Sequence, residues 1–349
     1  AAAIVGHHAV VRFDAVLGVD DQAVAAANAA ARALGFAHNP EHAVRATRDK
    51  LAMREAFGVA GLRQPAFASL SPEDDAGAVG ETIGYPCVMK PTGLAASRGV
   101  IRVDDPDEAR TAHLRIRAIL DCAGLHPDAP IVVESFVPGA EIAVEAVLRD
   151  GTLEVLAFFD KPDPLNGPYF EESIYTTPSR HPRPTLHAAC AEVEAAAAAL
   201  GLREGPVHAE LRLADAGPVV LELAARTIGG LCGRILRFGV DVSLEEVVIR
   251  HALGMEGVAR RQSGGAGVMM LPIPGRGRLV RIEGLEAARR VRGVLDIDIT
   301  VPPGRLIEPL PEGDRYLGFA FAAGATPDDA EVALRRAHDA LRIVVAPEA

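Results

Sequence analysis

A pair of predicted strands near the middle of the chain constrains its fold more than any other segment. The strands, Val207–Leu213 and Pro218–Ala224, are joined by the turn sequence Ala-Asp-Ala-Gly. A turn centred between them places Glu210 on the first strand opposite Glu222 on the second. Because side chains alternate along a strand, His208 shares the face of Glu210, whereas the neighbouring leucines point the other way. The sequence therefore predicts a hairpin with one apolar face and two opposed carboxylates on the other.

Two carboxylates directly opposite each other on paired strands repel, which weakens the sheet unless the charge is compensated. A shared divalent cation removes that cost, and hard oxygen ligands suit magnesium. The alternative is that Glu210 and Glu222 lie on a solvated face. The following residues favour a ligand, because Arg226 comes at the strand end and Gly229-Gly230 are predicted to open a helix, which suits an anion. A metal with a phosphate is the first hypothesis.

The length and charge of the chain limit the other classes of function. Its 349 residues allow two or three domains. The formal net charge of −11 argues against nucleic acid or an anionic membrane as a general partner, but it is compatible with a local basic pocket for a nucleotide. No apolar run is long enough to cross a bilayer.

The four cysteines are far apart and lack metal-ligand spacing. They are therefore expected to be buried, reduced thiols of a cytoplasmic protein. The chain begins without Met, lacks the features of a secretion signal and enters an α/β pattern almost at once. This start is compatible with a missing N-terminal segment.

The first part of the chain predicts alternating strand and helix. An apolar strand over Phe13–Val19 is followed by an alanine-rich helix over Gln22–Leu34 and by a second helix over Glu41–Phe57. This order is typical of the second half of a small doubly wound domain. The second helix contains Asp49-Lys50, and the residues alone favour a solvent-facing position for this pair.

A loop of small residues follows a strand that ends in Lys90. Ser97 and Arg98 lie at the tip of the loop, and a second strand begins at Gly99. Such a loop can offer backbone N–H groups and a cation to phosphates. The alternative is an ordinary hairpin with Lys90 reaching the solvent, and no G-x-x-x-x-G-K-[ST] sequence occurs.

Glu134 closes the apolar run at the start of a predicted strand, Ile131–Val137, and the next strand places Glu141 and Glu145 on one face. A carboxylate at the end of an apolar strand can accept an N–H bond from a ligand, or it can cap the turn that follows. From Gly264 onward, short strands punctuated by Gly and Pro precede a helix and a terminal strand. This texture predicts a separate, small α+β lobe.

In their order along the chain these pieces resemble the ATP-grasp superfamily, and within it the L-amino-acid-ligase-like carboxylate–amine ligases. The resemblance covers nearly the whole chain. The residues that carry it are Asp49-Lys50, Val88-Met-Lys90-Pro, Ser97-Arg98-Gly99, Glu134-Ser-Phe-Val137-Pro-Gly-Ala-Glu141, Glu210 and Leu221-Glu222-Leu-Ala-Ala-Arg226.

The resemblance implies a fold of mixed α/β and α+β class, the ATP-grasp fold, in which two α+β lobes clamp ATP. A partial N-terminal doubly wound α/β domain and a small C-terminal α+β lobe would flank them. The expected boundaries are 1–45 for the N-terminal domain, 46–136 and 137–260 for the two lobes of the core, and 261–349 for the C-terminal lobe.

The resemblance also assigns roles in binding ATP. Lys50 and Lys90 would contact the phosphates, and the small-residue loop would fold over them. Glu134 would accept a hydrogen bond from the adenine amino group, and Glu141 would bind the ribose hydroxyls. The backbone of two further residues, Phe136 and Val137, would serve the edge of the ring.

The same resemblance gives Glu210 and Glu222 to magnesium (or manganese) ions that bridge the phosphates. Arg226 would stabilise an acylphosphate and the transition state, with Lys90 assisting. The chain departs from the family at Ala224, where relatives often have a metal-binding Asn, so we expect two protein ligands and leave the number of ions open. The phosphate loop also has Leu-Ala-Ala where many relatives have glycines.

The function implied is an ATP-dependent ligase that joins a carboxylate, in particular that of an amino acid, to an amine through an acylphosphate. The candidate substrate residues are Tyr175, Arg180, His181, His208, Gly229 and Gly230. The sequence names neither substrate nor the base that deprotonates the amine. A homodimer is expected by family analogy only.

Two alternatives stay open. One is an ATP-grasp enzyme that activates bicarbonate or formate, as biotin-carboxylase-like and purine-pathway members do. The other is a nucleotide-binding module without catalysis. The presence of Glu210, Glu222 and Arg226 favours catalysis, and the form of the second strand end with the small C-terminal lobe favours the ligase.

Overall fold

The structure is a computed structural model that describes residues 1–126, 128–255 and 261–347. It divides into two compact units. Unit 1 contains residues 1–64, 141–160 and 177–263, and unit 2 contains residues 65–140, 161–176 and 264–349. Among the described helices, none combines the length and the apolar character that a membrane span needs.

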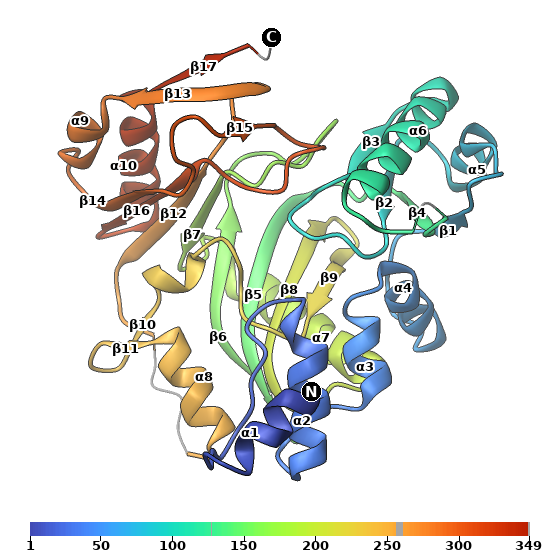
Figure 1. Ribbon diagram of the computed structural model, residues 1–349, viewed down its shortest axis with the longest axis vertical. Coiled ribbons are helices and arrows are strands. Elements are labelled where there is room, and N and C mark those ends of the chain that lie inside the picture. Colours follow the sequence, from blue (N-terminus) through green and yellow to red (C-terminus); the bar gives the residue numbers. More distant parts are fainter. Residues whose placement is uncertain (127, 256–260, 348–349) are drawn as a thin grey trace. The chain divides into compact units, whose positions relative to one another are not determined.

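Unit 1 is built on four neighbouring strands in the order β6-β5-β8-β9 (Figure 1). The strands are β5 (Ala140–Arg149), β6 (Thr152–Lys161), β8 (Gly205–Ala214) and β9 (Gly217–Ala224). The helices are α1 (Ala2–His8), α2 (Ala23–Leu34), α3 (Glu41–Ala46), α4 (Lys50–Val59), α7 (Arg183–Leu200) and α8 (Leu244–Ala252). A short 3₁₀ helix, η1 (Cys232–Ile235), and the two-residue strands β10 (Arg237–Phe238) and β11 (Val242–Ser243) precede α8.

The core of unit 1 joins α4 and α7 to the sheet. Met53 and Phe57 lie one turn apart on α4, and they pack with Val193 of α7 and with Val207 and Leu223 of the hairpin. This packing places the first turn of α4 beside the hairpin that the sequence singled out.

The helix predicted over Glu41–Phe57 is in fact two helices, because the helical conformation is interrupted between α3 and α4. Asp49 has extended backbone angles, and its side chain accepts hydrogen bonds from the backbone N–H groups of Leu51 and Ala52. It is therefore an N-cap, the position where Asp is strongly preferred. Lys50, which begins α4, is only 8% exposed, so the expectation of a solvent-facing lysine is wrong.

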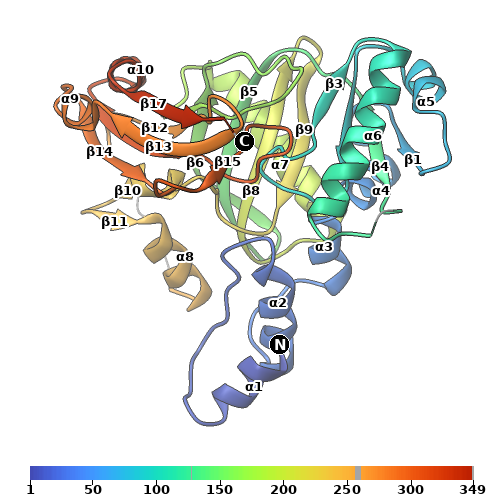
Figure 2. The ribbon, with the colours of Figure 1, turned by 45° about the horizontal axis from the view of Figure 1, so that its top comes forward.

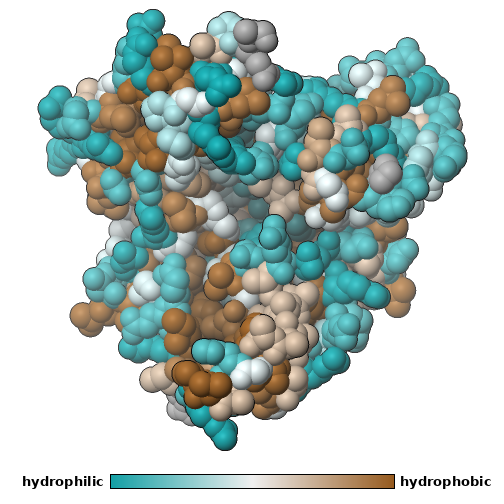
Figure 3. All heavy atoms as spheres, viewed as in Figure 1, coloured by the Kyte–Doolittle hydropathy of each residue, from teal (hydrophilic) through white to brown (hydrophobic). Residues whose placement is uncertain are grey.

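The strand predicted over Phe13–Val19 does not form. Residues 1–45 contain helices and loops but no strand, so the strand–helix alternation expected there is wrong. The ring of His8, at the end of α1, packs edge-on against Phe13 and Phe36, with ring centroids 4.6 and 5.6 Å away. Figure 3 shows apolar side chains at the surface near these helices, where Val10 and Val11 are exposed.

Unit 2 contains an antiparallel sheet in the order β1-β4-β2-β3. Its strands are β1 (Phe67–Leu70), β2 (Cys87–Pro91), β3 (Ile101–Val103) and β4 (Ile131–Ser135), with α5 (Ala76–Ile83) and α6 (Pro106–Cys122). Figure 2 shows α6 along one face of this sheet. Ile116 and Leu120 of α6 pack there on Met89, Ile131 and Val133.

Unit 2 also contains the C-terminal residues. The strands β14-β16-β12-β7 are neighbours in that order, and β15-β13-β17 form a three-stranded sheet. Their bounds are β7 (Ile174–Thr177), β12 (Gly265–Leu271), β13 (Gly277–Glu283), β14 (Val294–Ile299), β15 (Leu306–Ile307), β16 (Gly318–Gly324) and β17 (Arg342–Ala346), with helices α9 (Leu285–Arg289) and α10 (Pro327–Asp339). The helix α10 packs on β12 and β16 through Ala330, Ala333 and Leu334. The strands and helices expected after Gly264 are present, but these residues share one compact unit with residues 65–140 and 161–176. A separate C-terminal lobe stays a prediction, and the predicted boundary at residue 260 lies outside the described residues.

The four cysteines are free thiols, as expected. Cys87 and Cys232 are buried, but Cys122 is exposed. The expectation that all four are buried is therefore wrong.

Candidate active site

The register of the β8–β9 hairpin confirms the central prediction. Glu210 pairs directly with Glu222, and His208 lies opposite Ala224. The register shifts immediately after Glu210, so Leu221 has no partner on the other strand. The Glu210 and Glu222 side chains are 22% and 32% exposed, so both carboxylates are accessible to a ligand.

Two side chains of α4 fix the β9 side of this pair. The Nζ atom of Lys50 lies 3.4 Å from Oε2 of Glu222. One turn further on, the guanidinium of Arg54 donates hydrogen bonds to the carbonyl oxygens of Val220 (3.2 Å) and Leu221 (2.6 Å). Arg54 therefore satisfies backbone groups at the register shift, which is where a strand leaves its carbonyls unpaired. The sequence did not indicate Arg54, because its partners lie more than 160 residues further along the chain.

His208 lies between two carboxylates. Its Nδ1 atom is 3.2 Å from Oε2 of Glu145, and its Nε2 atom is 3.5 Å from Oε1 of Glu210. Burial alone lowers the pKa of His208, but the hydrogen bonds to Glu145 and Glu210 outweigh it and raise the pKa to about 9. Burial raises the pKa of Glu145, and its bonds to His208 and to the Ile228 N–H oppose that shift. We take the ring as protonated, because each of its nitrogens faces a carboxylate.

Arg226 lies directly beyond the hairpin and is paired with an aspartate. Its Nε and Nη2 atoms each lie 2.9 Å from one carboxylate oxygen of Asp21. This is the two-pronged geometry in which a guanidinium is held most firmly. The sequence reasoning did not single out Asp21. No α-helix begins at Gly229-Gly230, and the helix that follows is the four-residue η1, which starts at Cys232. A role of the two glycines in binding an anion stays a prediction.

Glu141, the predicted ribose ligand, belongs to β5. Its Oε2 atom lies 2.9 Å from Nε of Arg212, and both side chains are almost completely buried. The pair is held on the sheet of unit 1. Its role in binding a nucleotide stays a prediction.

In unit 2, Lys90 and Glu134 form a buried ion pair. They lie on the neighbouring strands β2 and β4, and Nζ of Lys90 is 2.7 Å from Oε2 of Glu134. The two side chains are only 10% and 3% exposed. The structure thus brings together two residues that the sequence predicted to bind different parts of one ligand. After β4, Phe136 donates its N–H to the Pro86 carbonyl (3.0 Å), and Val137 follows, half-buried.

The small-residue loop before β3 is held by a segment near the C-terminus. The Gly99 N–H donates to the Pro311 carbonyl (2.9 Å), and Nε of Arg98 donates to the Glu312 carbonyl (3.0 Å). Ala96 and Ser97 have φ angles of +56° and +55°. Residues other than glycine adopt such angles infrequently, so the loop has a defined conformation although it lacks the family's glycines.

Arg115 of α6 anchors the other end of this contact. Its guanidinium donates to both carboxylate oxygens of Glu312, to Oε2 at 2.9 Å, and also to the hydroxyl of Tyr169. The hydrogen bond to Glu312 raises the pKa of Arg115, and burial opposes that shift. Segment 309–313 is thus tied to α6 as well as to the loop.

The remaining substrate candidates are divided between the units. In unit 1 the backbone N–H of Arg180 donates to Oδ2 of Asp160 (2.7 Å), and Nε2 of His181 lies 4.0 Å from its Oδ1. In unit 2 the ring of Tyr175 is buried, with Nζ of Lys161 4.9 Å from its centre. Each candidate has a local partner.

The carboxylate pair of the hairpin fits a divalent cation by its chemistry. Carboxylate oxygens are the ligands that magnesium takes from proteins, usually one or two per ion, and water and phosphate oxygens complete the shell. In the described part of the chain, no cluster of three or more His, Cys, Asp or Glu side chains could hold a metal. The expectation of two protein ligands, Glu210 and Glu222, stays a prediction.

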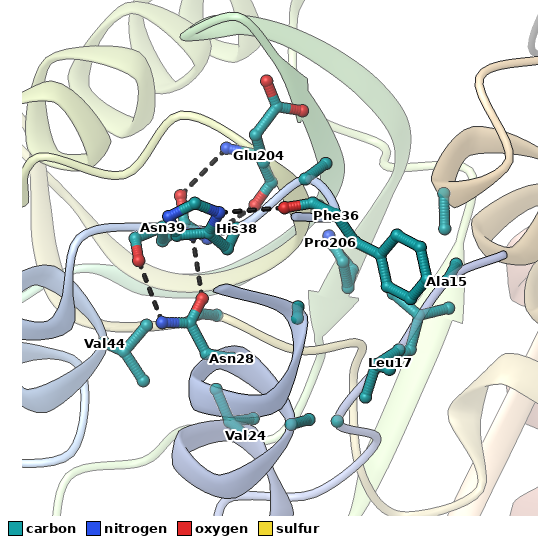
Figure 4. A pocket seen from close by; sticks show the side chains of 18 of the residues that line it. Ala15, Leu17, Val24, Asn28, Phe36, His38, Asn39, Val44, Glu204 and Pro206 are labelled. Atoms are coloured by element: carbon teal, nitrogen blue, oxygen red, sulfur yellow. Dashed lines mark hydrogen bonds between the residues drawn. The ribbon is translucent and has the colours of Figure 1, made fainter. Parts of the chain in front are cut away.

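A separate cavity of about 80 Å³ lies in unit 1 between α2, the segment 36–39 and the start of β8 (Figure 4). Asn39 spans one wall. Its side chain donates to the Glu204 carbonyl and accepts from the backbone N–H groups of Arg203 and Glu204, while its backbone N–H donates to Asn28. These hydrogen bonds join the segment 36–39 to α2 and to the residues before β8. None of the predicted site residues lines the cavity.

Two family models match the chain. Residues 83–235 match the ATP-grasp domain, and residues 269–346 match the L-amino acid ligase C-terminal domain 2. The solved L-amino acid ligase from Bacillus licheniformis superposes with a TM-score of 0.84 at 29% sequence identity. That comparison covers 99% of this chain and 84% of the other.

Curated relatives are similar over shorter shares of their length. An uncharacterized protein of Sinorhizobium fredii, y4rH, is 28% identical over 305 residues, which is 86% of this chain and 61% of that protein. Alanine–anticapsin ligase of Bacillus subtilis is 28% identical over 249 residues, 66% of this chain and 52% of that ligase. The chain thus spans half to three fifths of the length of these two relatives. It has the ATP-grasp fold, and it carries an ATP-grasp domain followed by the C-terminal domain of L-amino acid ligases.

Proposed function

We propose that this protein is an ATP-dependent carboxylate–amine ligase that uses an amino acid as a substrate. The observation that carries the proposal is the pairing of Glu210 with Glu222, with Arg226 at the end of the same strand. The similarity of residues 269–346 to the C-terminal domain of L-amino acid ligases supports the choice of reaction.

The chemistry explains why such an enzyme needs ATP. A carboxylate is a poor electrophile, because its two oxygens share a negative charge. Transfer of the γ-phosphoryl group of ATP to one of these oxygens gives an acylphosphate and ADP. The amine then attacks the acyl carbon, the C–O bond to phosphate breaks, and the amide forms with loss of phosphate and of the amine proton. Positioning and charge neutralisation supply most of the catalysis in phosphoryl transfer.

Each cationic side chain has a proposed place in that reaction. Lys50 and Lys90 neutralise the phosphates, with Ser97, Arg98 and Gly99 of the loop closing over them. In this arrangement Lys50 exchanges its contact with Glu222 for a phosphate oxygen. Lys90 is already held at a fixed depth by its buried carboxylate partner, which limits the loss of side-chain entropy on binding.

Glu210 and Glu222 would hold magnesium, which, when bound, neutralises charge on the phosphates. Arg226 stabilises negative charge on the acylphosphate and on the transition state. Asp21 presents the guanidinium in one orientation. Arg226 is thereby preorganised before the substrate arrives.

For the nucleoside we propose the roles that the family resemblance assigns. Glu134 and the backbone of Phe136 and Val137 serve the adenine, and Glu141 serves the ribose. The burial of Glu134 and Glu141 beside Lys90 and Arg212 supports well-defined positions for both carboxylates.

The substrates are proposed by class. Tyr175, Arg180 and His181 lie in the segment 160–181, where specificity is expected to reside. Two curated relatives are named for ligases of alanine, alanine–anticapsin ligase and D-alanine–D-alanine ligase. Alanine and other small amino acids are therefore the first substrates to test.

The competing candidate is an ATP-grasp enzyme that activates bicarbonate or formate. The similarity of the C-terminal residues to L-amino acid ligases favours the amide-forming reaction. A nucleotide-binding module without catalysis has no need for both Glu210 and Glu222 on one face.

The test is release of ADP in the presence of magnesium and a panel of amino acids, single and in pairs, with mass spectrometry of the products. We expect release that depends on amino acids and a dipeptide or related amide. Bicarbonate and formate serve as the comparison. Release with those two alone, and none with any amino acid, would overturn the proposal.

A further inference from the structure

Among the described residues of unit 1, Glu145 carries the most deeply buried charged group. It lies on β5, is 0% exposed and has only apolar residues beside it on its strand. Its two oxygens accept hydrogen bonds from the backbone N–H of Ile228, both at 3.1 Å. Its Oε2 atom also contacts Nδ1 of His208 at 3.2 Å.

These contacts continue to the carboxylate pair of the hairpin. An imidazole is rigid, so fixing Nδ1 fixes the position of Nε2 on the far side of the ring. Nε2 of His208 lies 3.5 Å from Oε1 of Glu210. The chain of contacts therefore runs from the Ile228 N–H through Glu145 and His208 to Glu210, entirely within unit 1.

Stability alone does not account for this arrangement. Burying a charge is costly, and a buried ion pair is often no more stabilising than apolar side chains of the same size. An apolar residue at 145 would match its neighbours on β5. The Glu145–His208 pair does fix geometry, because it contacts one carboxylate of the hairpin and one backbone segment at the same time.

We propose that Glu145 and His208 are positioning residues that set the orientation of the Glu210 carboxylate and tie it to the segment carrying Arg226. Arg226 lies two residues before Ile228, whose N–H is bound to Glu145. The groups proposed to bind metal and acylphosphate are thereby kept at a fixed separation. The inference rests on the metal role proposed for Glu210. His208 is then a positioning residue and does not contact the substrate.

The probe is Mn²⁺, measured by the electron paramagnetic resonance of the free ion, with the protein saturated with ADP. Replacing a residue that orients a metal ligand typically weakens metal binding by 10- to 100-fold, so His208→Gln is expected to weaken Mn²⁺ binding about tenfold or more. The affinity for ADP without a divalent cation is expected to stay within about twofold, since only the orientation of Glu210 changes.

His251→Gln is the matched control. His251 is another buried histidine of unit 1, and its Nδ1 atom lies 3.2 Å from Arg149. Its removal reports the cost of losing a buried imidazole away from the carboxylate pair. Mn²⁺ affinity is expected to stay unchanged in His251→Gln, while its melting temperature falls.

Glu145→Gln is the second variant. It keeps the shape of the side chain and an oxygen that can accept the Ile228 N–H, but it removes the charge that holds the ring. It is expected to weaken Mn²⁺ binding as well. If His208→Gln fails to fold, this variant alone decides the matter.

The outcomes separate this inference from the proposed reaction. Mn²⁺ affinity within about twofold of the wild type in folded His208→Gln and Glu145→Gln would overturn the inference, whatever amide is made. A wild-type protein that binds no Mn²⁺ would overturn it together with the metal role of Glu210. Weaker Mn²⁺ binding in the variants of a protein that makes no amide would support the inference and remove the proposed ligase reaction.

Discussion

Lys90 and Glu134 are two buried side chains of opposite charge on neighbouring strands. Removing one partner of a buried pair leaves the other charge in a poorly solvated site. We therefore expect Lys90→Met to lower the free energy of unfolding by roughly 3 kcal/mol. The Michaelis constant for ATP should rise at the same time, because a phosphate contact is lost. Urea unfolding and ADP release measure the two effects.

The double variant Lys90→Met/Glu134→Leu separates stability from binding. With both charges gone, much of the lost stability should return, whereas use of ATP should stay impaired. An unchanged response to ATP in the single variant would remove Lys90 from the site. Unchanged stability would show that Glu134 is solvated.

Glu222→Gln is expected to reduce turnover by about 100-fold or more, because the loss of a charged metal ligand weakens both binding and orientation of the ion. Lys50 keeps its place on α4 in this variant but loses a negative partner 3.4 Å away. Glu246→Gln is the control, since Glu246 lies on α8 in a half-exposed pair with Arg250. Turnover near the wild-type rate in Glu222→Gln would show that the metal assignment is wrong.

At the scale of elements, the N-cap of α4 sets where Lys50 begins its helix. Asp49→Ala should lower the free energy of unfolding by about 1 kcal/mol through loss of the cap. It should also raise the Michaelis constant for ATP, because Lys50 is no longer fixed. Thr326→Ala removes the cap of α10 in unit 2 and should cost a similar stability without affecting ATP. Equal effects of the two variants on ATP use would contradict this interpretation.

The loop before β3 depends on a second element, the segment 309–313. Glu312→Gln weakens the contact with Arg115 and should loosen the segment that accepts from Gly99 and Arg98. Charge-assisted hydrogen bonds contribute roughly 1.5 kcal/mol or more, so the Gly99 amide should exchange its hydrogen about tenfold faster. Glu331→Gln, which alters an ion pair of α10 with Arg335, is the control. Equal exchange at Gly99 in Glu312→Gln and the wild type would show that Arg115 does not brace the loop.

Local sequence patterns predicted the elements that depend on local rules. The position of the turn predicted that Glu210 lies opposite Glu222, and the period of two along a strand predicted which side chains share their face. The break before α4 could have been found as well, since Asp49 is a preferred N-cap residue ahead of an apolar helix. The strand predicted over Phe13–Val19 has the right composition, but a strand needs a neighbour. None is present beside it in the described residues.

The partners of the charged residues could not be predicted in the same way. Glu145 meets His208, Arg226 meets Asp21 and Arg212 meets Glu141 across long stretches of sequence. Such contacts depend on how strands are ordered in the sheet and on how the N-terminal segment folds back. The sequence pattern contains no direct signal for either.

For the whole molecule, the boundaries of the family domains do not coincide with those of the compact units. The residues that match the ATP-grasp domain, 83–235, include parts of both units. The residues that match the C-terminal domain of L-amino acid ligases, 269–346, belong entirely to unit 2. The expected boundaries at residues 45, 136 and 260 stay predictions, and so do a homodimer and the lack of nucleic-acid or membrane partners.

Each unit is assembled from three separate segments, and this affects the order in which a ribosome can complete them. All residues of unit 1 have been synthesised by residue 263, whereas unit 2 still lacks its third segment, residues 264–349. Domains generally fold as units during synthesis. On stalled nascent chains of increasing length, we expect unit 1 to resist proteolysis before unit 2 does. The first two segments of unit 2 have been synthesised by then, but the loop before β3 still lacks its contacts with residues 309–313.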